Sequence, residues 1–459
     1  MRNREGDPAL SLTASQRRAR NRVALILGVG VVTAALGIVA YEFDILKSYE
    51  LKTVDARFAI RGSTGTPDDV VNVLIDDVTF NELRRPDGRK VQWPYPRRLH
   101  AGVISEVAKG KPAAILYDVQ FTEPTNAVDD NALILAAQKA GNVVFATTEV
   151  DENGRGDVFG GKYDKFGAAV GNANIIADSD GVLRHMPFEL DKLKSLGVVG
   201  AERALGHPLD PPASNSQWID YAGPPGTVKA YSFSRVLHGK VPPSAFQGKV
   251  VVIGPSAPSL QDVHATSASG SESMPGAEIQ ANAVETALRG FPLQSVPDWL
   301  NLSLIVLMSL IAPFVTLRLS GWWPGLVAVG AGALLAVGEQ LAFDNGWIAV
   351  FIYPLAALAL STAAALIIQY ILEAFDRALT RDAFSRFVPE TVVTKVLAKT
   401  DEHLRLGGER VTGTVMFTDL RGFTTFSESL PAEQVIELLN RYLSSMSDAI
   451  LAHEGTIVS

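Results

Sequence analysis

The sequence of 459 residues contains no cysteine. This absence excludes disulfide bonds, zinc sites built from thiolates and catalysis by a thiol nucleophile. Charge is also modest, because 41 Lys and Arg residues stand against 49 Asp and Glu residues, and the net charge of −8 is spread along the chain. Nucleic-acid surfaces concentrate basic residues, so we expect no nucleic-acid partner. A chain of this length can form two or three domains, each with its own core.

Four long stretches contain at most one charged residue each. Because about 20 apolar residues cross a bilayer, we predict membrane-spanning helices at residues 23–41, 300–317, 324–343 and 347–372. A cleaved signal peptide is an alternative for the first stretch, since it too has a basic start and an apolar middle. However, no small-residue cleavage site follows, and Tyr41 begins the bulky, acidic segment YEFD. We therefore favour an uncleaved anchor.

Basic residues at the ends of these stretches predict how the chain crosses the membrane. Cytoplasmic flanks favour Lys and Arg. Four arginines at residues 17–22 end the basic N-terminus at residues 1–22, Arg318 follows the second span, and Arg377 and Arg381 follow the fourth. We therefore place these segments in the cytoplasm. Residues 42–297 then form an extracytoplasmic domain of a multi-pass protein of the cell (inner) membrane, with membrane lipid as a constant partner.

Glu339 is the single charged residue within the predicted spans. A carboxylate inside a membrane is a functional hypothesis by default, and a transporter or channel is one alternative function. Glu339 lies about one helical turn from Asp344, near the outer end of its span. We therefore expect Glu339 to reach headgroup water.

The exterior residues alternate between short apolar runs and helix-like stretches. We predict strands at residues 70–75, 113–117, 143–147 and 250–253, with helices at 99–108 and 131–139 between them. This alternation predicts an α/β domain with parallel strand pairs.

Carboxylates follow two of these strands: Asp76 and Asp77 follow the first, and Asp118 follows the second. Open α/β sheets bind ligands at the carboxyl ends of their strands. These three residues are therefore candidates for a sensor pocket. The alternative, that they cap the turns that follow, is equally compatible with the pattern.

Five stretches of the exterior domain match one family in order. They are VVNVLIDDVTFNEL, WPYPRRLHAGVI, AAILYDVQFTEP, VGNANIIADSDGVLRHMP and MPGAEIQANAVETALRG. Together they resemble the CHASE2 extracellular sensor domain, from about residue 44 to residue 293. The resemblance implies the input module of a bacterial receptor, usually followed by three membrane helices, as here. It implies a sensing role for an unknown extracytoplasmic signal.

Residues 373–406 are predicted to form a helical connector, with an amphipathic helix on the membrane surface as the alternative. A strand is then predicted at residues 411–418, ending at Asp419, and a helix is predicted to begin at Phe423 after Gly422. A carboxylate at a strand end beside the free N–H groups of a helix start can hold magnesium against phosphates. By itself, an Asp-x-x-Gly turn is also compatible with simple capping.

The stretch TVMFTDLRGFTTFSESLPAEQVIELLNRYLSSMSDAILAHEGTI closely resembles the start of the class III nucleotidyl cyclase catalytic domain. The preceding FSRFVPETVVTKVL resembles the connector of such domains. The resemblance implies that Asp419 is the first of two metal-binding aspartates and that the Leu420 carbonyl helps to bind a metal ion. It also implies that Gly422, Phe423 and Thr424 lie against the phosphates of the nucleotide.

The resemblance implies conversion of ATP, with GTP less favoured, to cyclic AMP and pyrophosphate by a homodimer with two Mg²⁺ or Mn²⁺ ions. The family's second aspartate is expected shortly after Gly455-Thr456-Ile457, where this chain has Val458 and Ser459. We therefore expect residues 407–459 to be the first part of a truncated catalytic domain, inactive as it stands. A natural end, a frameshift and an incomplete gene are all compatible with the sequence.

The sequence thus predicts a multi-domain α/β membrane protein. It has an extracytoplasmic α/β sensor domain, four transmembrane helices and part of an α+β class III cyclase catalytic domain. The first hypothesis for its function is a transmembrane, sensor-type adenylate cyclase in signal transduction. The alternative is a non-catalytic CHASE2 membrane sensor or a dominant partner of an intact cyclase.

Overall fold

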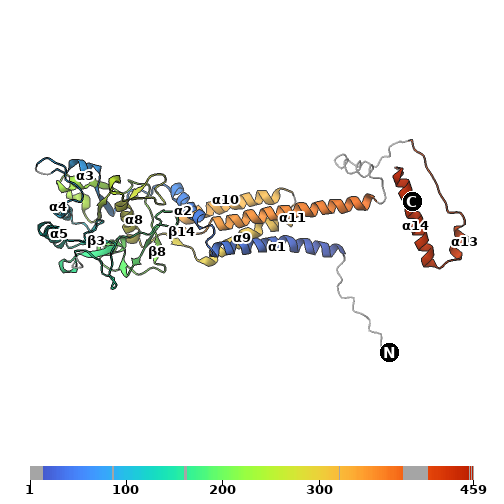
Figure 1. The fold of residues 1–459 in the computed structure, drawn as a ribbon, viewed down its shortest axis with the longest axis horizontal. Coiled ribbons are helices and arrows are strands. Elements are labelled where there is room, and N and C mark those ends of the chain that lie inside the picture. Colours follow the sequence, from blue (N-terminus) through green and yellow to red (C-terminus); the bar gives the residue numbers. More distant parts are fainter. Residues whose placement is uncertain are drawn as a thin grey trace, which may run out of the picture. The chain divides into compact units, whose positions relative to one another are not determined.

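The computed structural model describes residues 14–84, 87–159, 163–319, 321–385, 412–453, 455 and 457. The chain divides into two compact units, Met1–Ala363 and Ala364–Ser459. The first unit contains an α/β domain, called the exterior domain below after its predicted location, and most of the apolar helices (Figure 1).

A six-stranded parallel sheet forms the centre of the exterior domain, with the strand order β4-β3-β2-β10-β1-β9. Its strands are β1 (Val70–Ile75), β2 (Ala114–Tyr117), β3 (Val143–Thr147), β4 (Ala169–Asn172), β9 (Ala230–Ser232) and β10 (Val250–Pro255). The four predicted strands and their parallel pairing are confirmed to within two residues. The central strands are apolar throughout because both of their faces are buried.

Helices cover both faces of this sheet. On one face lie α4 (Arg97–Ala108), α5 (Ala127–Ala140) and α7 (Phe233–Leu237), which pack on side chains such as Val251 and Ile253. On the other face lie α6 (Leu196–Leu205) and α8 (Gly276–Leu288), which pack on the alternate residues Val250 and Val252. The period of two along each strand therefore produces two separate apolar layers.

Shorter elements complete the exterior domain. They are α3 (Asp77–Glu82), the 3₁₀ helices Tyr163–Phe166, Pro243–Phe246 and Pro258–Leu260, and the antiparallel pairs β5 (His185–Pro187) with β8 (Ser216–Trp218), β6 (Glu189–Leu190) with β7 (Leu193–Lys194), and β11 (Val263–His264) with β12 (Met274–Pro275).

Four helices in the described part of the chain are long and apolar enough to cross a membrane, over residues 20–42, 298–316, 323–344 and 352–379. They belong to α1 (Ala14–Glu42), α9 (Asp298–Thr316), α10 (Trp323–Asp344) and α11 (Ile352–Ser385). The first three predicted spans agree with these helices closely. Between α1 and β1, the further helix α2 (Lys47–Arg61) joins the apolar helices to the exterior domain (Figure 1).

The predicted start of the fourth span at Trp347 is wrong. Trp347 and Ile348 form β14, which pairs in parallel with β13 (Gln294–Ser295), and the helix begins at Ile352. Apolar composition does not distinguish a buried strand from a helix, and here the backbone of residues 347 and 348 bonds to a strand distant in sequence.

The second unit contains the end of α11, followed by α13 (Phe423–Glu428) and α14 (Ala432–Ala452). Beyond the end of α14, the Gly455 N–H donates to the Ile450 carbonyl at 2.8 Å and so satisfies one of the last carbonyl groups of the helix. Residues 386–406 of the predicted connector lie outside the described residues, whereas residues 373–385 are helical as predicted.

The strand predicted at residues 411–418 is wrong for its described residues, 412–418, which adopt no regular structure. A strand needs a partner for its backbone groups, and the described residues of this unit contain no neighbouring strand. The apolar side chains of this segment are accordingly exposed, including Phe417 at 94%.

Truncation of the fully buried Ile253 tests the central role of β10. We expect Ile253→Ala to lower the free energy of unfolding of the exterior domain by about 2–5 kcal/mol, because it leaves a cavity between sheet and helices. Ile253→Val should cost about 0.5–1.5 kcal/mol. Denaturant unfolding of the chain in nanodiscs measures both values, and equal losses would contradict this packing.

Candidate functional site

The predicted sensor-pocket carboxylates have different environments at the carboxyl edge of the sheet. Asp76 is the N-cap of α3, where its carboxylate accepts hydrogen bonds from the Thr79 N–H at 2.8 Å and the Thr79 hydroxyl at 2.7 Å. It also accepts a hydrogen bond from the Ser232 hydroxyl. Asp77 is exposed in the first turn of α3. For Asp76 this geometry matches the capping alternative.

Asp118, by contrast, lines a cavity of about 340 Å³ beyond the ends of β2 and β4. The cavity brings Asp118 together with Asp262 and His264, neither of which was predicted from the sequence. Its wall consists of Ala173, Asn174, Ile175, Ala177, Leu183, Gly276, Ile279 and Gln280. The position at the carboxyl ends of parallel strands is the one at which α/β sheets bind ligands.

The start of α8 is shaped by Asp262. A Cβ atom on Gly276 would lie 2.3 Å from a carboxylate oxygen of Asp262, so only glycine allows the carboxylate to approach the helix this closely. Negative charge at the N-terminus of a helix is favourable. Asp262 therefore has a structural role at α8, which leaves Asp118 as the cavity carboxylate without such a role.

The pKa of Asp118 is raised to about 7, chiefly by burial and also by the nearby charge of Asp262, while His264 acts in the opposite direction. His264 contacts the Asp262 carboxylate at 3.1 Å, and this hydrogen bond raises the pKa of His264. Within the described part of the chain, no hydrogen bond to the Asp118 carboxylate is formed. Asp118 is therefore available to accept hydrogen bonds from a donor or cation in the cavity.

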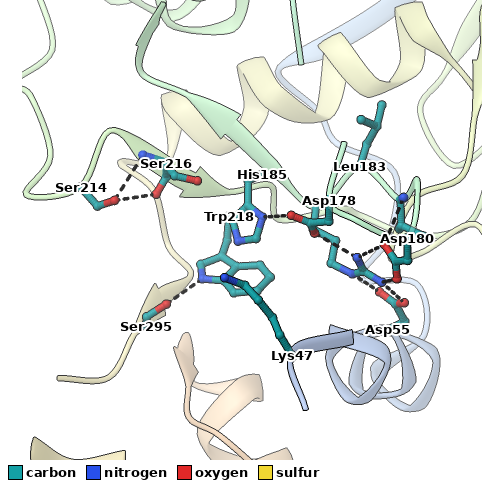
Figure 2. A network of polar contacts seen from close by, with 12 residues as sticks. Lys47, Asp55, Asp178, Asp180, Leu183, His185, Ser214, Ser216, Trp218 and Ser295 are labelled. Atoms are coloured by element: carbon teal, nitrogen blue, oxygen red, sulfur yellow. Dashed lines mark hydrogen bonds and ion pairs between the residues drawn. The ribbon is translucent and has the colours of Figure 1, made fainter. Parts of the chain in front are cut away.

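A second polar cluster contains Asp55, Asp178, Asp180 and His185 (Figure 2). The guanidinium of Arg184, which is fully buried, donates five hydrogen bonds of 2.6–2.9 Å to Asp55, Asp178 and Asp180. All five N–H groups of the side chain are thereby used. His185 contacts the other oxygen of Asp178 at 3.3 Å.

Only part of this cluster can be recognised in the sequence. Asp178, Asp180 and Arg184 lie in the stretch VGNANIIADSDGVLRHMP, but Asp55 lies 129 residues before Arg184, on α2. No pattern in the sequence joined the two. The cluster also adjoins the cavity, because Leu183 lines the cavity and Arg184 follows it directly.

The expectation that Glu339 reaches headgroup water is wrong. Its side chain is 7% exposed, and Oε2 lies 3.7 Å from Nη1 of Arg57 on α2. Arg57 also lies 3.5 Å from Glu50. A buried arginine on α2 thus replaces water as the partner of this carboxylate, and the sequence alone did not place α2 beside α10.

The residues expected to bind metal and nucleotide lie at the start of the second unit's helices. Asp419 is exposed and its carboxylate accepts from the N–H of Leu420 at 2.9 Å. Gly422 has a φ of 75°, which glycine adopts readily, and precedes α13. The N–H of Phe423 donates to the Leu420 carbonyl at 3.3 Å, and Thr424 is exposed.

These donors alone do not fit a centre for two metal ions. Asp419 supplies one carboxylate, and the Leu420 carbonyl, which accepts one hydrogen bond, keeps a second lone pair. Among the residues that the structure describes, no group of three or more His, Cys, Asp or Glu side chains could hold a metal ion.

Comparison with known proteins identifies the exterior domain. The family model of the CHASE2 domain matches residues 28–313, which include parts of the flanking apolar helices α1 and α9. The chain belongs to the CHASE2 domain family. No solved structure matches the chain.

Curated relatives match a shorter stretch. The chain is 38% identical to adenylate cyclase 1 of Rhizobium meliloti (strain 1021) over 84 residues, which is 17% of this chain and 12% of that protein. It is 33% identical to an adenylate cyclase of Anabaena cylindrica over 72 residues, 16% of this chain and 14% of that protein. It is also 35% identical over 82 residues, 18% of the chain, to 14% of an uncharacterized protein of Mycobacterium tuberculosis (strain ATCC 25618 / H37Rv). The chain thus covers about an eighth of the length of these relatives.

The raised pKa of Asp118 predicts a pH-dependent effect of its removal. The folded state binds this proton more tightly than the unfolded chain does, so ionisation of Asp118 costs stability as pH rises from about 4 to about 7. Asp118→Asn should therefore raise the melting temperature of the exterior domain above about pH 7 and have little effect near pH 4. Thermal unfolding across this range measures the difference.

The exposed Asp77→Asn is the matched control and should show no such pH-dependent gain. If Asp118→Asn and Asp77→Asn behave alike at every pH, the Asp118 carboxylate is not desolvated in the cavity.

Proposed function

We propose that this chain is the sensing and membrane portion, with the beginning of the catalytic domain, of a transmembrane adenylate cyclase. The observation that carries this proposal is the presence in one chain of a CHASE2 domain and of similarity to adenylate cyclases. The exterior domain senses a signal, and the complete enzyme converts ATP to cyclic AMP and pyrophosphate. ATP is the substrate, GTP is less favoured, and the working form is a homodimer.

The proposed roles of the second-unit residues follow the family resemblance. Asp419 and the Leu420 carbonyl contribute to a site for Mg²⁺ or Mn²⁺, and Gly422, Phe423 and Thr424 lie against the phosphates of ATP. The exposed Asp419 carboxylate is accessible for such a role. Further donors are needed to complete a two-ion site, so we propose that this chain by itself is inactive.

We propose that the cavity around Asp118 receives the exterior signal. The support for this site is its position at the carboxyl edge of the sheet and a carboxylate without a hydrogen-bond donor from the described residues. A small molecule with an N–H or O–H donor or a positive charge would complement Asp118. Asn174 and Gln280 add polar groups, and Ile279 adds an apolar wall.

The second candidate is a non-catalytic CHASE2 sensor, or a dominant partner of an intact cyclase. Its support is the CHASE2 match, which does not depend on the residues that follow α11. Co-expression with an intact homologue is its test. A non-catalytic partner should change the cyclic AMP made by the homologue, and unchanged production would remove the support for this role.

The absence of cysteine allows a direct test of the proposed topology, with the N-terminus and residues after α11 in the cytoplasm. A single cysteine introduced as Asn345→Cys, in the turn between α10 and α11, should react with a membrane-impermeant maleimide in intact cells. Leu319→Cys, in the turn between α9 and α10, should react with the same reagent only after the membrane is permeabilised. The reverse pattern would place the exterior domain in the cytoplasm.

The catalytic proposal is tested on the chain extended through a complete catalytic domain. This protein should make cyclic AMP from ATP and Mg²⁺ or Mn²⁺, and Asp419→Ala should reduce the rate by at least about 100-fold, since metal-bound charge stabilisation is worth several kcal/mol. The exposed Glu433→Ala on α14 is a control that should retain activity. Full turnover by Asp419→Ala would remove this residue from the mechanism.

A further inference from the structure

We propose that α2 is the coupling element of this receptor, which transmits changes at the exterior cavity to the outer end of α11. In α2, different side chains bind the exterior domain and the membrane helices. α11 continues as one helix from Ile352 to Ser385, beyond the apolar span that ends at residue 379. This inference rests on the sensing half of the proposed function and does not depend on cyclase activity.

One side of α2 holds the beginning of α11. The Glu50 carboxylate accepts hydrogen bonds from the N–H of Phe351, at 2.9 and 3.0 Å to its two oxygens, and from the N–H of Ile352 at 2.8 Å. The first N–H groups of a helix have no partner within the helix, and negative charge stabilises that end. Glu50 therefore caps α11 from a different helix.

Arg57 strengthens this attachment on the same side of α2. Its Nη1 donates to the Ala349 carbonyl at 3.0 Å, and its guanidinium lies 3.5 Å from Glu50 and 3.7 Å from Glu339 on α10. Arg57 is 6% exposed, and Oε2 of Glu339 forms no hydrogen bond among the described residues. One buried guanidinium thus balances two carboxylates, Glu50 on its own helix and Glu339 on α10, and a shift of α2 would disturb its pairing with Glu339.

Another side of α2 is bound by the exterior domain. Arg184 donates to both oxygens of Asp55, at 2.8 Å from Nε and 2.6 Å from Nη2. Glu50 and Asp55 are five residues apart, so they project about 140° apart around the helix. The helix is therefore held from two directions, by the exterior domain at Asp55 and by the membrane helices at Glu50.

Apolar packing fixes α2 between the two bodies. The Phe58 ring packs edge-on against Tyr221 of the exterior domain, at 6.0 Å between centroids, and against Phe343 of α10, at 4.9 Å. Arg61 donates to Asp220 at 2.7 Å, and its guanidinium lies over the Phe343 ring. α2 has close-packed contacts with both the exterior domain and α10. A movement of α2 toward one of them must displace side chains there and open the contacts with the other.

The contacts also lead back to the cavity. Leu183 and Ala177 line the cavity, and the residues that follow them, Arg184 and Asp178, belong to the cluster that binds Asp55 (Figure 2). A ligand that moves this wall changes the hydrogen bonds of Arg184. The contacts thus run in order from the cavity wall through Arg184 to Asp55 on α2, and from Glu50 on the same helix to the start of α11.

A second connection serves as an internal reference. β13 pairs with β14 just before α11, and the Asn301 side chain accepts from the Val350 N–H at 3.2 Å. These contacts do not involve α2. The pairing of β13 with β14 should therefore persist in variants that alter the α2 contacts alone.

Amide hydrogen exchange on the whole chain in nanodiscs tests the coupling. Glu50→Gln should accelerate exchange at Phe351 and Ile352 roughly tenfold, because hydrogen bonds to charged groups are worth more than those to neutral ones. Asp55→Asn, at the exterior contact, should accelerate exchange at the same two amides by about threefold or more. Lys52→Gln removes an exposed charge from the same helix. It is the matched control and should leave the exchange rates of both amides unchanged.

Acceleration by both Glu50→Gln and Asp55→Asn, with the amides of β10 and β14 still protected, supports the coupling. If Asp55→Asn leaves the exchange rates of the Phe351 and Ile352 amides unchanged, α2 does not couple the exterior domain to α11 and the proposal is overturned. Loss of protection in β10 would show that Asp55→Asn unfolds the exterior domain. In that case Arg184→Lys, which keeps the positive charge, replaces it, and exchange is measured at the same two amides. Because no cyclic AMP is measured, a failure here is distinct from failure of the cyclase proposal.

Discussion

A charge that leaves water must find an opposite charge or backbone groups of suitable polarity, and this constraint organises the region between the exterior domain and the apolar helices. Glu50, Arg57 and Glu339 are each largely buried there, and each is compensated by a group on another element. Glu50 satisfies the first N–H groups of α11, so its charge also determines where that helix is held. The buried charges thus specify how the two parts of the first unit fit together.

The exterior domain supplies the other end of this arrangement through its parallel sheet. Parallel strands place their carboxyl ends at one edge, and the cavity around Asp118 lies at that edge. The segment that forms one wall of the cavity continues into Arg184, which donates two of its five hydrogen bonds to Asp55 of α2. The cavity and α2 are therefore connected by covalent neighbours and hydrogen bonds, without a flexible linker between them.

The sequence predicted those features that arise from local patterns. Apolar runs such as residues 143–147 and 250–253 indicated the strands, and long uncharged stretches indicated the apolar helices. Contacts between distant residues could not be read in this way. Asp118, a sensor-pocket candidate from the sequence, lines a cavity, but its neighbours Asp262 and His264 follow a different strand, and Asp55 meets Arg184 across 129 residues. The strand predicted at residues 411–418 failed for the same reason, since a strand depends on a partner that the local sequence does not contain.

In the proposed coupling, α2 joins the polar cluster around Arg184 to the start of α11. A double-mutant cycle between Arg184→Gln and Glu50→Gln measures this connection, since these two residues form no hydrogen bond or ion pair with each other. Changes at distant, independent sites usually add within about 0.3–0.5 kcal/mol. If α2 links the sites, the double variant should lose less stability than the sum of the single variants, by more than about 0.5 kcal/mol. Strict additivity in the free energy of unfolding, measured in nanodiscs, would contradict the account.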